Sequence, residues 1–206
     1  MSLDSTIQNM FPLLTASRED VHRAPLHNGT RYIAAQDGLW REVSLPWIFA
    51  LHRIAHSEFP LPYGTLSEQV SVKCGPIPKE LRTRFIQDAK RALPNEMAAA
   101  LIWNSVDASW RYASRRPLSA SSSYVAYSEV ELADGEFLVC DLHSHAQFDA
   151  FFSALDDRDD QGSMKFSGVI GKVGSQQLSS TMRLNLLGKT WDGNLAANGQ
   201  LEVLCH

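Results

Sequence analysis

The sequence predicts an α+β fold, a mixed sheet flanked by helices, preceded by an α/β extension at the amino-terminal end. Three observations support this prediction. One stretch shows a clear helical apolar period, the stretch after it is an apolar run short enough for a buried strand, and several further strand-like segments follow with one more helical segment among them. At 206 residues the chain is long enough for one domain and an extension.

The first part of the chain, residues 1–75, is predicted to contain a hairpin and a helix. Asp37-Gly38 lies between two strand-like stretches, and glycine tolerates the positive φ of a tight turn. Apolar residues recur at helical spacing through residues 46–56, so a helix is expected there. Prolines and glycines then concentrate between residues 60 and 78, which places a domain boundary near residue 75.

The second part, residues 76–206, is predicted to carry the mixed sheet. A helix is expected after Pro78, because proline suits a first helical turn and apolar residues follow at every fourth position. A second helix is expected over residues 148–157, and the serine-rich residues 115–122 are expected to form a mobile loop. Strands are expected at residues 97–103, 109–112, 123–132, 136–143, 165–173, 181–187 and 200–204.

Charge and cysteine content exclude several classes of protein. The net charge is -4 and no basic block is longer than Arg115-Arg116, so a nucleic-acid partner is not expected. No run of eighteen apolar residues and no signal-peptide pattern is present, so no membrane association is expected. The 3 cysteines are widely spaced and form no C-x-x-C pair. A reducing cytoplasm is the expected compartment.

The pattern H-x-H-x7-S-x-x-D, formed by His143, His145, Ser153 and Asp156, is the most informative feature of the chain. Residues i and i+2 of a strand share a face, so both imidazoles can converge on one ion. Serine and aspartate are expected on one polar stripe of the following helix. Two imidazoles and a carboxylate are the ligands of an open zinc site, and the serine hydroxyl can donate to a developing oxyanion.

The alternative interpretation is an exposed histidine pair beside a solvated acidic helix end. Asp159 and Asp160, which follow the motif, are expected to be solvent-facing or helix-terminal charge. Ser153 and Asp156 share one stripe of the predicted helix that follows the histidines, and this favours the metal site. A zinc-activated water also needs a proton acceptor, and Glu96, at the start of a buried apolar strand, is the best candidate general base.

These residues resemble the JAMM motif of the JAB/MPN metalloproteases, and residues 78–103 resemble that family's opening helix, P-x-E turn and strand. The resemblance covers about residues 76–206 and implies a JAB/MPN-like, cytidine-deaminase-like fold. It implies zinc on His143, His145 and Asp156, with Glu96 as general acid and base and Ser153 as oxyanion donor. The implied activity is zinc-dependent peptide or isopeptide hydrolysis.

Within the family, residues 141–145 and 151–157 are most similar to the bacterial PRTRC system protein A group. Such gene cassettes also encode a small β-grasp protein and a ThiF-like adenylating protein. The resemblance therefore implies a ubiquitin-like tail or conjugate as the substrate, with the adenylating protein as a further candidate partner. The family commonly has glycine and proline where this chain has Ala99 and Ala146, which bears on substrate geometry and turnover.

Two other functions stay open at the level of sequence. Many MPN domains bind no metal and serve as interaction scaffolds. The D-x-H-x-H pattern at residues 141–145 also resembles the opening motif of PHP-type phosphoesterases. That motif stands near the start of such barrels and is followed by many further ligands, whereas here only His206 remains among later histidines. The phosphoesterase is therefore the weaker alternative.

Overall fold

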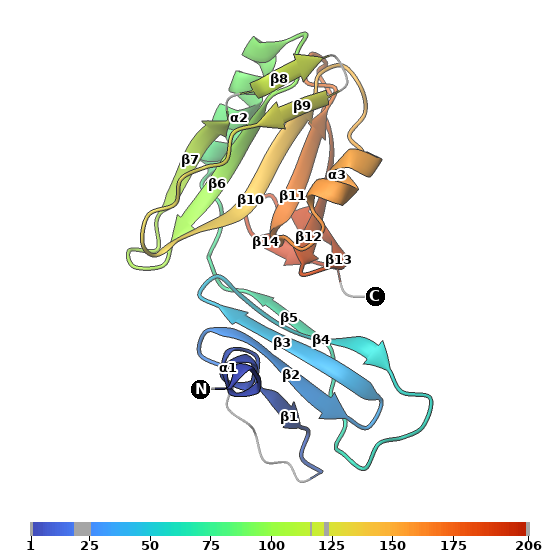
Figure 1. The fold of residues 1–206 in the computed structure, drawn as a ribbon. Helices are drawn as coiled ribbons and strands as arrows, with labels where there is room; N and C mark the ends of the chain where they lie inside the picture. The colour runs from blue at the N-terminus through green and yellow to red at the C-terminus, as the bar shows by residue number, and fades with distance from the viewer. Residues whose placement is uncertain (1, 19–25, 116, 122–123, 205–206) are drawn as a thin grey trace. The chain divides into compact units, whose positions relative to one another are not determined.

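The computed structural model describes residues 2–18, 26–115, 117–121 and 124–204. The chain divides into two compact units, Met1–Lys73 and Cys74–His206, each with a sheet of its own (Figure 1). Among the described residues, no helix has both the length and the apolar character needed to cross a membrane.

Unit 1, Met1–Lys73, is built on a five-stranded sheet with the order β1-β2-β3-β4-β5. The first two strands are parallel and the other neighbours are antiparallel. Its core includes Ile33, Trp40 and Leu51. The elements are α1 (Leu3–Met10), β1 (Leu13–Thr15), β2 (Gly29–Ala35), β3 (Gly38–Leu45), β4 (Ile48–His56) and β5 (Gln69–Val72).

The hairpin predicted in this unit is confirmed, but the helix predicted at residues 46–56 is wrong. β2 and β3 pair from Gly29↔Ser44 to Ala35↔Gly38. Residues 48–56 form β4, which pairs with β3 along its length, so tertiary pairing overrides the helical spacing. Ile54, the last residue of the apparent helical stripe, is 40% exposed and marks no buried face. In the described part of this unit, the helix is α1 instead.

Unit 2, Cys74–His206, carries a seven-stranded sheet with the order β14-β13-β12-β11-β10-β6-β7 and a separate hairpin of β8 and β9. β10 and β11 are parallel and the other pairs are antiparallel, so the predicted mixed sheet is confirmed. The strands are β6 (Ala98–Asn104), β7 (Trp110–Arg115), β8 (Pro117–Ser121), β9 (Tyr124–Tyr127), β10 (Glu136–His145), β11 (Met164–Gly171), β12 (Ser179–Leu186), β13 (Lys189–Leu195) and β14 (Leu201–Val203).

The first helix of unit 2 forms where the sequence predicts it. α2 spans Lys79–Ala92 directly after Pro78, and it buries Phe85 and Ala89. The following strand, β6, is buried over six of its seven residues and lies between β10 and β7. This strand therefore supports one side of β10, the strand that carries the two candidate histidine ligands.

Four other predictions for unit 2 need correction. The strand predicted at residues 123–132 is only β9, which ends at Tyr127, and residue 123 lies outside the described residues. The helix predicted at residues 148–157 is only α3 (Ala154–Asp159), because Ser153 caps it and the preceding loop is tied to β11 and β12 by backbone and side-chain hydrogen bonds. The loop predicted at residues 115–122 contains β8, which pairs with β9; residues 116 and 122 lie outside the described residues. β13 was not predicted; it follows a turn with positive φ at Leu187 and Gly188 and pairs with β12 and β14.

Candidate metal centre

β10 places the two predicted histidine ligands side by side. His143 and His145 lie on one face of the strand, and Ser144 lies on the other, where it is 1% exposed. The Ser144 Oγ accepts a hydrogen bond from the backbone N–H of Met97 (3.1 Å), and the Ser144 N–H donates to the Met97 carbonyl (2.9 Å). The residue between the histidines thus fixes the chain directly after Glu96 against β10.

A capping box at the start of α3 holds the third predicted ligand. The Ser153 Oγ accepts from the backbone N–H of Asp156 (3.3 Å), and the Ser153 backbone N–H donates to Asp156 Oδ2 (2.7 Å). The Ser153 hydroxyl also donates to Oδ2 (2.6 Å). This leaves Asp156 Oδ1 facing His143, 3.5 Å from its Nε2. Ser153 is therefore the cap of α3 and does not lie on its face as predicted, although S-x-x-D is also a known capping pattern.

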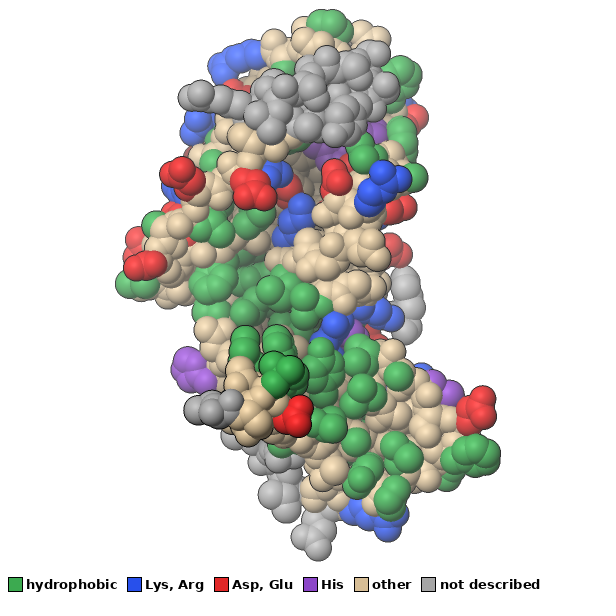
Figure 2. Space-filling view, in the orientation of Figure 1, with side chains coloured by type: hydrophobic (Ala, Val, Ile, Leu, Met, Phe, Trp, Pro, Cys, Tyr) green, Lys and Arg blue, Asp and Glu red, His purple; other side chains and the backbone are tan. Residues whose placement is uncertain are grey.

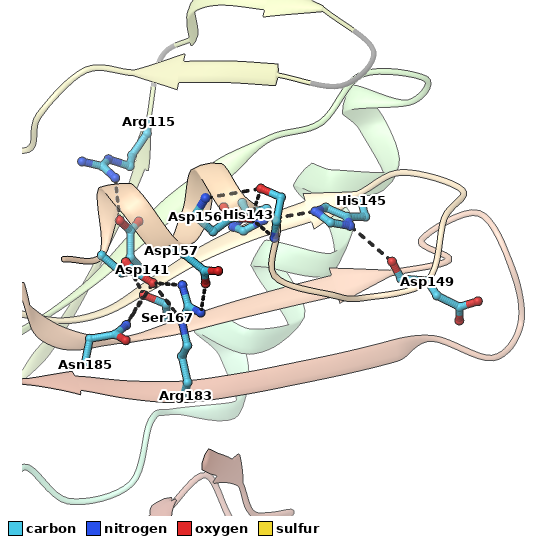
Figure 3. A network of polar contacts seen from close by, with 12 residues as sticks. Arg115, Asp141, His143, His145, Asp149, Asp156, Asp157, Ser167, Arg183 and Asn185 are labelled. Carbon is cyan, nitrogen blue, oxygen red and sulfur yellow. Dashed lines mark hydrogen bonds and ion pairs between the residues drawn. The ribbon is translucent and has the colours of Figure 1, made fainter. Parts of the chain in front are cut away.

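Two of the distances between ligand atoms are close to those around a tetrahedral ion. Bonds of about 2.0–2.2 Å at tetrahedral angles place ligand atoms about 3.3–3.6 Å apart. The two Nε2 atoms are 3.2 Å apart, and one ligand atom of each of His143, His145 and Asp156 lies within 4.8 Å of the others (Figure 3). These three residues could therefore hold a metal, as the sequence predicts.

Hydrogen bonding and burial suit the two histidines to metal binding. His145 Nδ1 lies 3.2 Å from the Asp149 carbonyl, which can only accept, so Nδ1 is the donor and Nε2 lies toward His143. Burial is the main cause that lowers the pKa of His143, opposed by the nearby Asp156 carboxylate. His143 is therefore neutral at neutral pH, which is the form of imidazole that binds metals.

A cleft of about 680 Å³ opens over these ligands, and Glu96, the predicted general base, lines it together with them. Figure 2 shows acidic and basic side chains gathered around this hollow of unit 2. Glu96 is half-buried, and burial is the largest cause that raises the pKa of its carboxyl above 4.5. The carboxylate of Asp156 raises it further, and His145 opposes the shift.

One residue of the site region was misjudged from the sequence. Asp160 was expected to be solvent-facing or helix-terminal charge, and it does end α3, but it is only 8% exposed. Its carboxylate accepts hydrogen bonds from Ser167 and Arg183 on the neighbouring strands. The sequence did not indicate this burial, because three other acids precede Asp160 in residues 156–159 and charged runs are usually solvated. Asp159, in contrast, is exposed as expected.

Comparison with known families decides what this unit is. Residues 78–185 match the model described as prokaryotic homologs of the JAB domain, which covers more than half of the chain. The chain belongs to the JAB family. Residues 1–73 match a separate model described as a domain of unknown function, DUF2016. A search of curated proteins gives no match.

The structure explains one departure of this JAB domain from the pattern expected for the family. Ala146, which replaces the common proline after the second histidine, has φ +29° and is buried. Proline fixes φ near −65° and could not adopt this conformation. Hydrogen bonds from Val173 N–H to the Ala146 carbonyl and from Lys172 N–H to the Phe148 carbonyl, both 2.7 Å, hold the chain where it leaves β10.

Proposed function

We propose that the protein is a zinc-dependent peptidase or isopeptidase of the JAMM type. The observation that carries the proposal is the convergence of His143, His145 and Asp156 ligand atoms within 4.8 Å, at a cleft that Glu96 also lines. The donor set favours zinc, because two imidazoles and one carboxylate leave a fourth position open for water. The proposed substrate is the carboxyl-terminal tail or conjugate of a small ubiquitin-like β-grasp protein.

Glu96 and Ser153, at the cleft, have separate roles in the proposed reaction. Zinc, when bound, supplies Lewis acidity toward the attacking water and the scissile carbonyl. Glu96 takes the proton from that water and delivers it to the leaving amine, a task that its raised pKa suits. Ser153 lies at the ligand Asp156 and is proposed as the hydroxyl donor to the oxyanion, which requires its proton to move away from Asp156 Oδ2.

The proposed partners follow from the resemblance of residues 141–145 and 151–157 to the PRTRC group. A β-grasp protein would supply the tail to be cut, and a ThiF-like adenylating protein is a further candidate partner. The proposal places the reaction in the bacterial cytoplasm. No role for nucleic acid or a membrane is proposed.

Metal analysis and a cleavage assay together test the proposal. Protein purified without added zinc is expected to contain close to one zinc per chain, and His143→Ala is expected to lose it. Glu96→Gln is expected to keep zinc and fold but to lose cleavage of β-grasp tail fusions, measured by mass spectrometry of new termini. Glu129→Gln, a change to an exposed acid of the same cleft, is the matched control and should cleave normally.

Two outcomes would contradict this function. A well-folded wild-type protein that stays empty of metal in the presence of zinc would favour the interaction scaffold instead. If Glu96→Gln cuts tail fusions at the wild-type rate, Glu96 is not the general base.

A further inference from the structure

The helix that carries Asp156 is held to its sheet in an unusual way. α3 has six residues, all described, and none of them is buried. A short helix without an apolar face gains little stability of its own. Something other than hydrophobic packing must therefore fix the position of Asp156.

The buried carboxylate of Asp160 supplies this attachment. Asp160 Oδ1 accepts from the Ser167 hydroxyl (2.9 Å) and lies 3.3 Å from the Lys165 ammonium. Asp160 Oδ2 accepts from Arg183 Nε (3.0 Å) and Nη2 (2.7 Å) and from Asn185 Nδ2 (2.9 Å). Both oxygens are thus saturated by donors, several of them charged, which are the stronger kind.

The four donors form one patch of the sheet. Lys165 and Ser167 lie two apart on β11, and Arg183 and Asn185 lie two apart on β12, so each pair shares a face. The strands pair Ser167↔Arg183 and Lys165↔Asn185. The sheet therefore gathers these four donors around the Asp160 carboxylate, and Figure 3 shows Ser167, Arg183 and Asn185 beside one another there.

A direct hydrogen bond joins this attachment to the proposed metal ligand. The backbone N–H of Asp160 donates to the carbonyl of Asp156, one helical turn earlier, at 2.9 Å. Arg183 adds a second contact, because its Nη1 reaches Asp157 Oδ1 (2.5 Å) and its guanidinium lies 3.9 Å from the centre of the Phe152 ring. Both ends of the ligand's helix are thereby fixed, by Ser153 at the start and by Asp160 at the end.

We infer that Asp160 is a positioning residue: its carboxylate anchors α3 on β11 and β12 and thereby holds Asp156 at the metal site. Only the claim that Asp160 holds Asp156 at the metal site rests on the proposed function. The anchoring of α3 concerns the metal-free protein and can be measured without zinc.

Asp160→Asn is the sharpest test, because the side chain keeps its shape but loses its charge. The amide nitrogen of asparagine can only donate, so it would face the N–H or O–H groups of Arg183, Asn185 or Ser167 without an acceptor between them. Asp159→Asn is the matched control, since it removes the same charge from an exposed position of the same helix. Ser167→Ala is a milder second variant that removes one donor and keeps the carboxylate.

Three measurements decide the inference. Hydrogen exchange of the amides of residues 154–160 in metal-free protein is expected to speed up at least tenfold in Asp160→Asn, and less in Ser167→Ala. Zinc affinity is expected to fall by about 10- to 100-fold, as is typical when the support of a ligand is lost. The visible spectrum of the cobalt-substituted protein is expected to change, because the geometry of the third ligand changes. Asp159→Asn should match the wild type in all three.

Each result has one meaning. Unchanged exchange of α3 in Asp160→Asn, or in Ser167→Ala if Asp160→Asn does not fold, would overturn the anchor. Faster exchange with wild-type zinc affinity and cobalt spectrum would overturn the link to Asp156. If the wild-type protein binds no zinc, the proposed function is refuted, whereas the anchor is still judged by the exchange rates alone.

Discussion

Replacing Gly171 with alanine tests how closely the loop after His145 must lie against the sheet. An alanine Cβ at this buried position would lie 2.3 Å from Ala150 N and 2.5 Å from the Phe148 carbonyl oxygen. Ordinary contacts begin at 3.4 Å, so the loop must move away by about 1.1 Å, the difference between 3.4 and 2.3 Å. The obstacle is backbone, so no rotation of a side chain can relieve it.

This displacement should weaken zinc binding through His145. The carbonyl of Asp149, in the same loop, orients His145 at 3.2 Å, and an added 1.1 Å would break that hydrogen bond. Loss of such a partner typically costs about 10- to 100-fold in metal affinity, or about 1.4–2.7 kcal/mol. The overpacking itself should lower the free energy of unfolding by about 1–3 kcal/mol.

Competition with a chromophoric chelator measures the zinc affinity, at a temperature where circular dichroism shows the variant folded. Gly174→Ala is the matched control, because its Cβ would meet only Leu93 Cδ1 at an ordinary 3.6 Å. The reasoning is refuted if Gly171→Ala binds zinc as tightly as Gly174→Ala and the wild type.

Three further predictions concern single residues of the site. Ala146→Pro, which restores the residue common in the family, should destabilise the protein by about 3 kcal/mol in urea unfolding, because φ is +29° here; an unchanged midpoint would contradict this. Ser153→Ala should cost metal-free protein about 1 kcal/mol through loss of the cap, whereas Ser153→Thr should retain most of it. In metal-free protein the raised pKa of Glu96 favours folding below pH 4.5, and this contribution is lost as pH rises through the folded-state pKa, so Glu96→Gln should flatten the fall of stability in that window.

The parts of the fold that follow local rules could be predicted from the sequence. The two-residue period of a strand brings His143 and His145 to one face, and the apolar stripe of α2 buries Phe85 and Ala89. The hairpin of unit 1 follows from its turn residues. In each case neighbouring residues alone decide the outcome.

The parts that depend on distant partners could not be predicted. Residues 48–56 have helical spacing, but pairing with β3 makes them a strand. β8 has the composition of a loop, and its pairing with β9 is again tertiary. Asp160 has the sequence of a solvated charge, and only the converging donors of β11 and β12 show that it is buried. A pattern within one segment carries no information on these partners.

The parallel pairing of β10 with β11 has a consequence for exchanging parts between relatives. A parallel pair needs a connection that returns to the starting edge of the sheet, and here residues 146–163 make that return. A chimaera that imports this connector would bring its own acid ligand and cap. The imported connector would bind the sheet only if it also carried a carboxylate at the position of Asp160, because Arg183 and Asn185 on β12 belong to the host protein.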